Sequence, residues 1–97
     1  MYKILIVEDD PVIASSLARQ LTRWNYEATY VQEFDHVMQE FEKAQPDLVL
    51  MDITLPYFSG YYWCAEIRKI SRVPIVFLSS AADEMNQVMA LSMGADD

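Results

Sequence analysis

The sequence predicts a single α/β domain built on a doubly wound parallel sheet, with helices covering both faces. Three observations predict it. Short apolar runs alternate with amphipathic helical patterns along the chain. The runs are nearly continuous in apolar residues, which is typical of parallel strands buried on two sides. Finally, 97 residues, 53% of them hydrophobic, suffice for one compact core and no more.

Four runs are rich in β-branched and apolar residues and are predicted as strands. In chain order they are Lys3–Val7, Ala28–Val31, Leu48–Met51 and Ile75–Leu78, the second being weaker and more polar.

Helical spacing fills the intervals between these runs. Asp10 and Pro11 are a favoured N-cap and first helical residue. The apolar residues at helical spacing are Ile13, Leu17 and Leu21, then Phe34, Val37, Met38 and Phe41, then Trp63, Ile67 and Ile70. A fourth helix is predicted from Asp83 to Gly94, and Gly60 also lies where a helix could begin. The resulting βαβαβαβα order implies parallel pairing.

Composition excludes several functions. A net charge of −8 argues against direct binding of a phosphate backbone, so nucleic acid is not an expected ligand. One cysteine, Cys64, cannot form an internal disulfide, which favours a reducing cytoplasmic setting. No apolar run is long enough to span a membrane, and acids interrupt the opening MYKILIVEDD, so neither insertion nor export is expected.

Oxygen-bearing side chains follow three of the predicted strands. The first strand is followed by Glu8, Asp9 and Asp10, the third by Asp52, and the fourth by Ser79 and Ser80. In an open parallel sheet the ligand crevice lies outside the carboxyl ends of the strands, so these groups should converge. For Asp10, the simpler role of helix cap is favoured.

Clustered carboxylates repel one another unless a cation joins them, and an all-oxygen ligand set suits Mg²⁺. With a cation present, Asp52 could attack phosphorus and form an aspartyl phosphate, which the Ser79 hydroxyl could hydrogen-bond. The alternative is purely local: Asp52 caps the turn before Pro56, and the serines begin a loop.

The segments ILIVEDD, LVLMDITLPYFSG, PIVFLSS and GADD resemble the receiver domain of two-component response regulators, in order and along essentially the whole chain. The resemblance implies a flavodoxin-like fold with strand order 2-1-3-4 here. In the family a fifth strand, carrying a lysine, and a fifth helix follow. Residues 1–97 are therefore expected to be a C-terminally incomplete receiver domain, and an uncovered fourth strand would favour a homodimer or other self-association.

The resemblance also implies roles for individual residues. Asp52 is the expected phosphoacceptor, Ser79 the switch hydroxyl, and Mg²⁺ is held by Glu8, Asp9, Asp52 and the backbone carbonyl of Thr54. The implied phosphodonor is a phosphohistidine on a sensor histidine kinase. The implied output is a winged-helix DNA-binding domain outside this chain, in a subgroup similar to regulators that answer antimicrobial peptides or cell-wall antibiotics in Gram-positive bacteria.

Two other functions fit parts of the pattern. Asp52 after an apolar strand also resembles haloacid-dehalogenase-type phosphatases, but Thr54 stands where their second Asp is needed. A flavodoxin-like binding module needs a phosphate-cradling loop, and EDDPVIA lacks its glycines and hydroxyls. The aromatic run from Tyr57 to Trp63 is compatible with either packing or a docking surface.

Overall fold

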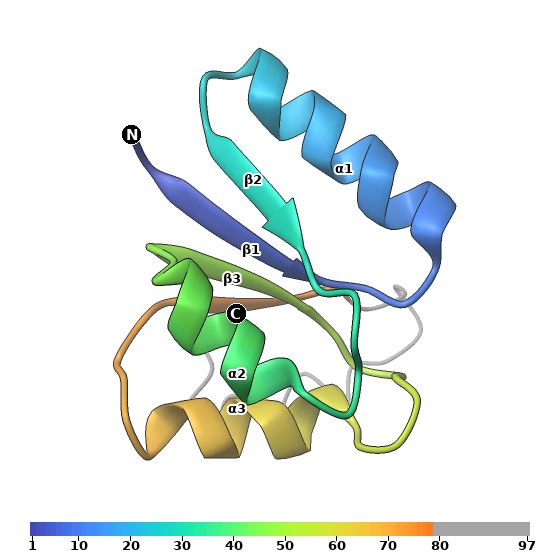
Figure 1. The fold of residues 1–97 in the computed structure, drawn as a ribbon, viewed down its shortest axis with the longest axis vertical. Helices are drawn as coiled ribbons and strands as arrows, with labels where there is room; N and C mark the ends of the chain where they lie inside the picture. The colour runs from blue at the N-terminus through green and yellow to red at the C-terminus, as the bar shows by residue number, and fades with distance from the viewer. Residues whose placement is uncertain (79–97) are drawn as a thin grey trace.

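The computed structural model describes residues 1–78, which form a four-stranded parallel sheet with helices on both faces (Figure 1). The strands are β1 (Lys3–Val7), β2 (Glu27–Tyr30), β3 (Leu48–Asp52) and β4 (Ile75–Leu78), and the helices are α1 (Pro11–Arg23), α2 (Val37–Ala44) and α3 (Gly60–Arg68). The strand order is β2-β1-β3-β4, so the predicted fold class and order are confirmed. The helix predicted from Asp83, and both Ser79 and Ser80, lie outside the described residues.

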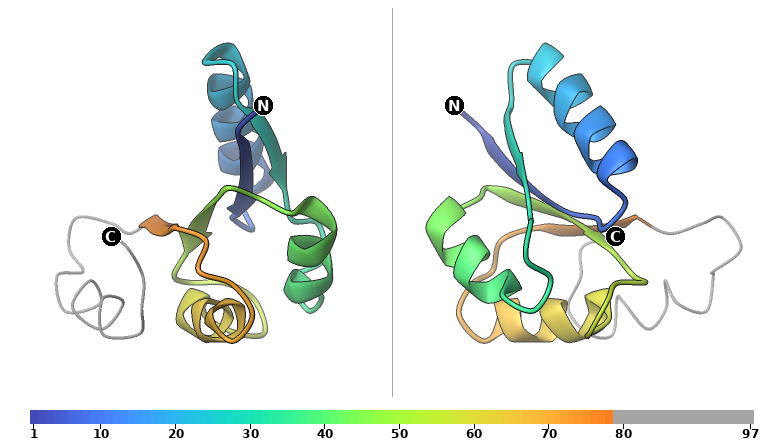
Figure 2. Two further views of the ribbon diagram at one scale, coloured as in Figure 1. Left: turned by 90° about the vertical axis from the view of Figure 1, so that its left-hand side faces the viewer. Right: turned by 45° about the vertical axis from the view of Figure 1, so that its right-hand side comes forward.

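The two faces of the sheet carry different helices (Figures 1 and 2). On one face α2 and α3 pack against the sheet through Phe41, Trp63 and Ile67, which join one large core cluster. On the other face Ala14 of α1 packs against Ile4 and Ile6 of β1. Full burial of an Ile or Phe side chain stabilises the fold by roughly 1.5–3 kcal/mol.

Burial is greatest in β1, one of the two strands with a neighbour on each side. Ile6 and Val7 are fully buried although they point to opposite faces. In β3 burial alternates instead: Val49 and Met51 are buried, whereas Leu50 is half-buried. The reason is that α1, the helix on that face within the described part of the chain, lies over β1 and β2. Two-sided burial is therefore complete at β1, whose end carries the first acidic residues.

The buried stripe of α1 differs from the predicted one. Asp10 caps α1 as predicted, accepting hydrogen bonds from the backbone of Val12 and Ile13. Ile13 itself is 46% exposed, and Ala14 takes the fully buried position. A small residue there lets the helix lie close to the sheet. The helical spacing grouped Ile13 with Leu17 and Leu21, but Ile13 lies at the margin of the buried face.

Three other boundaries differ from expectation. Phe34 precedes α2, which begins at Val37, and Phe34 packs against the core from the loop. Helix α3 ends at Arg68. Ile70 lies beyond it in a tight terminal turn, in which its N–H bonds to the Ile67 carbonyl, and its side chain is 57% exposed. Strand β2 is one residue earlier than predicted; Val31 is buried just past it.

The aromatic run from Tyr57 to Trp63 is only partly buried. Trp63 is buried in the core, whereas Tyr57, Phe58 and Tyr62 are exposed, with the Phe58 and Tyr62 rings stacked at 4.2 Å between centroids. Packing therefore accounts for Trp63 and not for Tyr57. None of the helices in the described region has the length and apolar character needed to cross a bilayer.

Candidate functional site

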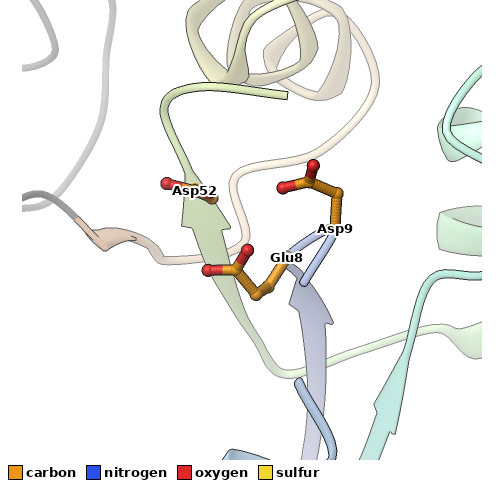
Figure 3. Close-up of side chains that lie close together, drawn as sticks. All are labelled: Glu8, Asp9 and Asp52. Atoms are coloured by element: carbon orange, nitrogen blue, oxygen red, sulfur yellow. The ribbon is translucent and has the colours of Figure 1, made fainter. Parts of the chain in front are cut away.

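Three of the predicted carboxylates lie together at one edge of the sheet. Glu8 and Asp9 follow the end of β1, and Asp52 is the last residue of β3 (Figure 3). The two strands are hydrogen-bonded neighbours in which Val7 pairs with Met51, so their ends coincide. One oxygen from each carboxylate lies within 4.8 Å of the other two. The predicted convergence of strand ends is thus present for these three residues.

Glu8 is the buried acid of this cluster, with only 8% of its surface exposed. Its Oε2 accepts a hydrogen bond of 3.0 Å from the Asp10 backbone N–H. Burial raises the pKa of Glu8 above its ordinary value; the Asp10 N–H opposes this, and the nearby Asp52 carboxyl adds to the rise. A negative charge at Glu8 is therefore unfavourable unless a cation compensates it.

Asp52 is half-buried, and its Oδ1 accepts a hydrogen bond of 2.8 Å from the Ile53 backbone N–H. Burial raises its pKa; the Ile53 N–H lowers it in part, and the Asp9 carboxylate raises it again. Burial thus raises the pKa of both acids and favours their neutral forms. Such paired shifts are typical of functional clusters.

The remaining predicted site residues have different outcomes. Asp10 is exposed and caps α1, as favoured, so it stands apart from the cluster. Thr54 lies in the loop that follows β3, on the side of the sheet where the cluster sits. Ser79 lies outside the described residues, so its role as switch hydroxyl stays a prediction.

The start of α3 lies against the end of β3, a contact that was not predicted from the sequence. Ser59 caps α3 by accepting a hydrogen bond from the Tyr62 N–H, and the Gly60 N–H donates to the Ile53 carbonyl at 2.8 Å. This hydrogen bond therefore joins the beginning of the loop after Asp52 to its end at Gly60. The sequence feature that could have indicated this contact is Gly60, the glycine at the end of the LPYFSG segment.

The donor set fits a hard divalent cation. Three carboxylates within mutual reach supply only oxygen ligands, the set that Mg²⁺ prefers. Burial raises the pKa values of Glu8 and Asp52, so a nearby cation would favour their charged forms. Glu8, Asp9 and Asp52 are thus the residues that could hold Mg²⁺ in this part of the chain.

A model of the response regulator receiver domain matches residues 4–97. The chain belongs to this family. Among relatives, it is 50% identical over 97 residues to an uncharacterized transcriptional regulatory protein, YvcP, of Bacillus subtilis, covering 100% of this chain and 41% of YvcP. The chain thus spans about two fifths of the length of the curated relatives it matches.

Solved receiver structures agree with the fold. The N-terminal domain of the nisin resistance regulator NsrR, a lantibiotic response regulator, superposes with a TM-score of 0.90 at 55% identity, covering 100% of this chain and 82% of that one. The BeF₃-activated receiver domain of Klebsiella pneumoniae RstA gives a TM-score of 0.92 at 36% identity, covering 98% and 81%.

Membership of the receiver family decides between the predicted functions. This is a receiver domain of two-component response regulators, a class of signalling proteins. The haloacid-dehalogenase alternative is not supported, in keeping with Thr54 at the position where those phosphatases need an acid. Receiver domains bind Mg²⁺ at an acidic pocket, and Glu8, Asp9 and Asp52 form an acidic cluster in this chain.

Proposed function

We propose that Asp52 is the phosphoacceptor of this receiver domain and takes its phosphoryl group from a phosphohistidine of a sensor histidine kinase. The observation that carries this proposal is the joint position of Glu8, Asp9 and Asp52 at the ends of two neighbouring strands. Asp52 is the member of the cluster that ends β3, and it is more exposed than Glu8. A donor can therefore reach Asp52 but not Glu8; Asp9 is exposed as well, and the resemblance to receiver domains is what assigns the phosphoacceptor role to Asp52.

In the proposed reaction a carboxylate oxygen of Asp52 forms a bond to phosphorus while the bond from phosphorus to the donor nitrogen breaks. The electron pair of that bond stays on the imidazole nitrogen. Glu8, Asp9, Asp52 and the backbone carbonyl of Thr54 are the proposed Mg²⁺ ligands. When bound, Mg²⁺ supplies positive charge that offsets the negative charge of the phosphoryl oxygens.

Two backbone N–H groups and one hydroxyl have separate roles in this proposal. The Ile53 N–H, bonded to Oδ1, fixes one oxygen of Asp52 and leaves the other for attack. The Asp10 N–H holds Glu8 in the cluster through Oε2. The Ser79 hydroxyl is the proposed partner of the new phosphoryl group, which biases the domain between two arrangements.

We further propose that phosphorylation controls a DNA-binding output domain of the full-length protein in the cytoplasm, without multiple turnover of any substrate. YvcP is called a transcriptional regulatory protein and NsrR a nisin resistance regulator, which supports a transcriptional output and a stimulus among antimicrobial peptides or cell-wall antibiotics. Self-association is a separate prediction, which gel filtration of the protein at several concentrations checks.

Intact-mass analysis of the full-length protein with acetyl phosphate and Mg²⁺ tests the assignment. The expected result is the addition of one phosphoryl group to the wild type and to Asp10→Asn, and none to Asp52→Asn. Asp10→Asn is the matched control because it removes a neighbouring acid from outside the cluster and keeps a capping side chain. Equal modification of Asp52→Asn and the wild type would refute Asp52 as phosphoacceptor.

A further inference from the structure

The first residue of α3 approaches the phosphoacceptor strand more closely than a side chain permits. Gly60 is buried, and a Cβ built on it would overlap the Asp52 carbonyl oxygen. The same Cβ would lie 3.0 Å from the Asp52 carbonyl carbon and 3.0 Å from Met51 Cγ. The opposing atoms are mainly backbone, so rotation of a flexible side chain cannot relieve the overlap.

Glycine is required at position 60 because a side chain has no room there, and not because of its backbone conformation. Gly60 does not have a left-handed φ, and it is the first helical residue, with Ser59 as its cap. An alanine at position 60 would therefore be acceptable to the helix and unacceptable to the neighbouring strand. This separates the role of Gly60 from the usual conformational role of glycine.

Neither the end of β3 nor helix α3 can move away from this contact without disturbing its other neighbours. The end of β3 lies between two strands, because Met51 pairs with Val7 of β1 and Asp52 pairs with Leu78 of β4. Helix α3 is held against the sheet by Cys64 and Ile67, both fully buried in the core. A side chain at position 60 would thus displace the connection between the two elements, or the strand end itself.

That connection carries the proposed site. It runs from Asp52 through Thr54 and returns to the strand end where the Gly60 N–H bonds to the Ile53 carbonyl at 2.8 Å. The Ile53 N–H in turn holds Asp52 Oδ1 at 2.8 Å. Gly60, Ile53 and Asp52 therefore form one short chain of contacts that ends on the reacting carboxylate.

We propose that Gly60 is a positioning residue for phosphoryl transfer. Its lack of a side chain lets α3 begin directly on the Asp52 main chain, and this contact sets where the Asp52 carboxylate and the Thr54 carbonyl stand relative to the cation. The inference rests on the proposed role of Asp52. Misplacement of a reacting group by about 1 Å reduces rates by up to roughly 100-fold, so a small displacement here has a large effect.

The test compares Gly60→Ala with Ala65→Gly in the full-length protein. Ala65 is half-buried in the same helix, so Ala65→Gly makes the reverse exchange and loosens α3 by about 1 kcal/mol without adding an atom near Asp52. Three quantities are measured for each variant: the free energy of unfolding, the Mg²⁺ dissociation constant, and the rate of phosphorylation by acetyl phosphate at saturating Mg²⁺.

We expect Gly60→Ala to remain folded, to bind Mg²⁺ more weakly, and to be phosphorylated roughly 10- to 100-fold more slowly. Ala65→Gly should lose stability but keep the wild-type rate and Mg²⁺ affinity. A purely structural glycine would give the opposite pattern, in which both variants lose stability and folded Gly60→Ala reacts at the wild-type rate.

Three results would overturn the proposal. The first is a wild-type rate in folded Gly60→Ala. The second is an equal loss of rate in Ala65→Gly, which would trace the effect to helix stability. The third is failure of Gly60→Ala to fold while Ala65→Gly folds, because the contact would then serve the whole fold. If the wild type is not modified at Asp52, the proposed function fails as well; in the other three cases it stands.

Discussion

Glu8 is a carboxyl group held where its charge is unfavourable, and this has a consequence for stability. Burial raises its pKa in the folded protein above the ordinary value of 4.5. Between these two pKa values the native state binds more protons than the unfolded state, so stability falls as pH rises through this window and stays lower above it. The group thus destabilises the metal-free protein at neutral pH.

We therefore predict that Glu8→Gln, in the presence of EDTA, is more stable than the wild type at pH 7. Glutamine keeps an oxygen that can accept the hydrogen bond from the Asp10 N–H. The advantage should shrink as pH falls and vanish below about pH 4.5, where Glu8 is neutral in both states. Urea unfolding at a series of pH values measures it, and a difference that does not change with pH would contradict the prediction.

Two adjacent aspartates offer a second prediction at the scale of single residues. Asp9 contributes an oxygen to the cluster, whereas Asp10 accepts hydrogen bonds from the first turn of α1. We expect Asp9→Asn to weaken Mg²⁺ binding by at least about tenfold, since even groups one shell further from a metal typically matter by 10- to 100-fold. Asp10→Asn should change the affinity little. Isothermal titration calorimetry at fixed ionic strength compares them.

Charge alone would give a different outcome. Both substitutions remove one negative charge from neighbouring positions, so a diffuse electrostatic attraction would weaken binding similarly in the two variants. Equal affinities for Asp9→Asn and Asp10→Asn would therefore count against a defined ligand set at the end of β1.

At the scale of elements, α1 depends on its first cap. Asp10 Oδ1 accepts hydrogen bonds of 2.9 Å from Val12 N–H and 3.3 Å from Ile13 N–H, and Pro11 begins the helix. We predict that Asp10→Ala lowers the free energy of unfolding by about 1 kcal/mol, and that Asp10→Asn retains most of it. Urea unfolding monitored by circular dichroism tests both; equal losses would show that the charge matters more than the cap.

The boundaries of strands and helices differ in how well the sequence predicts them. Apolar runs predicted β1 and β4 with the bounds observed, because no helical spacing of apolar residues competes with these runs. Helix α1 was also placed at its first residue, since Asp10 and Pro11 are local signals. Ile70 was misplaced because its spacing fits a helix, whereas the tight turn after Arg68 ends α3 earlier. Local chemistry was predictable; the competition that ends a helix was not.

In the site, too, some features were predictable from the sequence and others were not. Acids at the ends of two strands were recognisable because parallel strands present their carboxyl ends together, and Glu8, Asp9 and Asp52 do converge. The contact of Gly60 with Asp52 was not predictable, since it depends on the distance between a helix and a strand that tertiary packing sets. Spacing in a sequence carries no information on such distances.

At the scale of the whole molecule, the cluster exists only while the sheet is intact. Glu8 and Asp52 are distant in sequence and meet through the pairing of β1 with β3, in which Val7 lies beside Met51. The unfolded chain has no such arrangement, so a cation held by the cluster binds the native state preferentially. Stability and Mg²⁺ concentration should therefore be linked.

We predict that Mg²⁺ at about 100 times its dissociation constant raises the free energy of unfolding by about 2.7 kcal/mol. Asp52→Asn should start from a higher metal-free stability at neutral pH, because one raised-pKa carboxyl is removed, and should gain less from Mg²⁺. Thermal unfolding in MgCl₂, against NaCl of equal ionic strength, measures both effects. An equal Mg²⁺ gain in the wild type and in Asp52→Asn would mean that the ion acts elsewhere, because a site made by joining β1 to β3 must lose affinity when the β3 ligand is weakened.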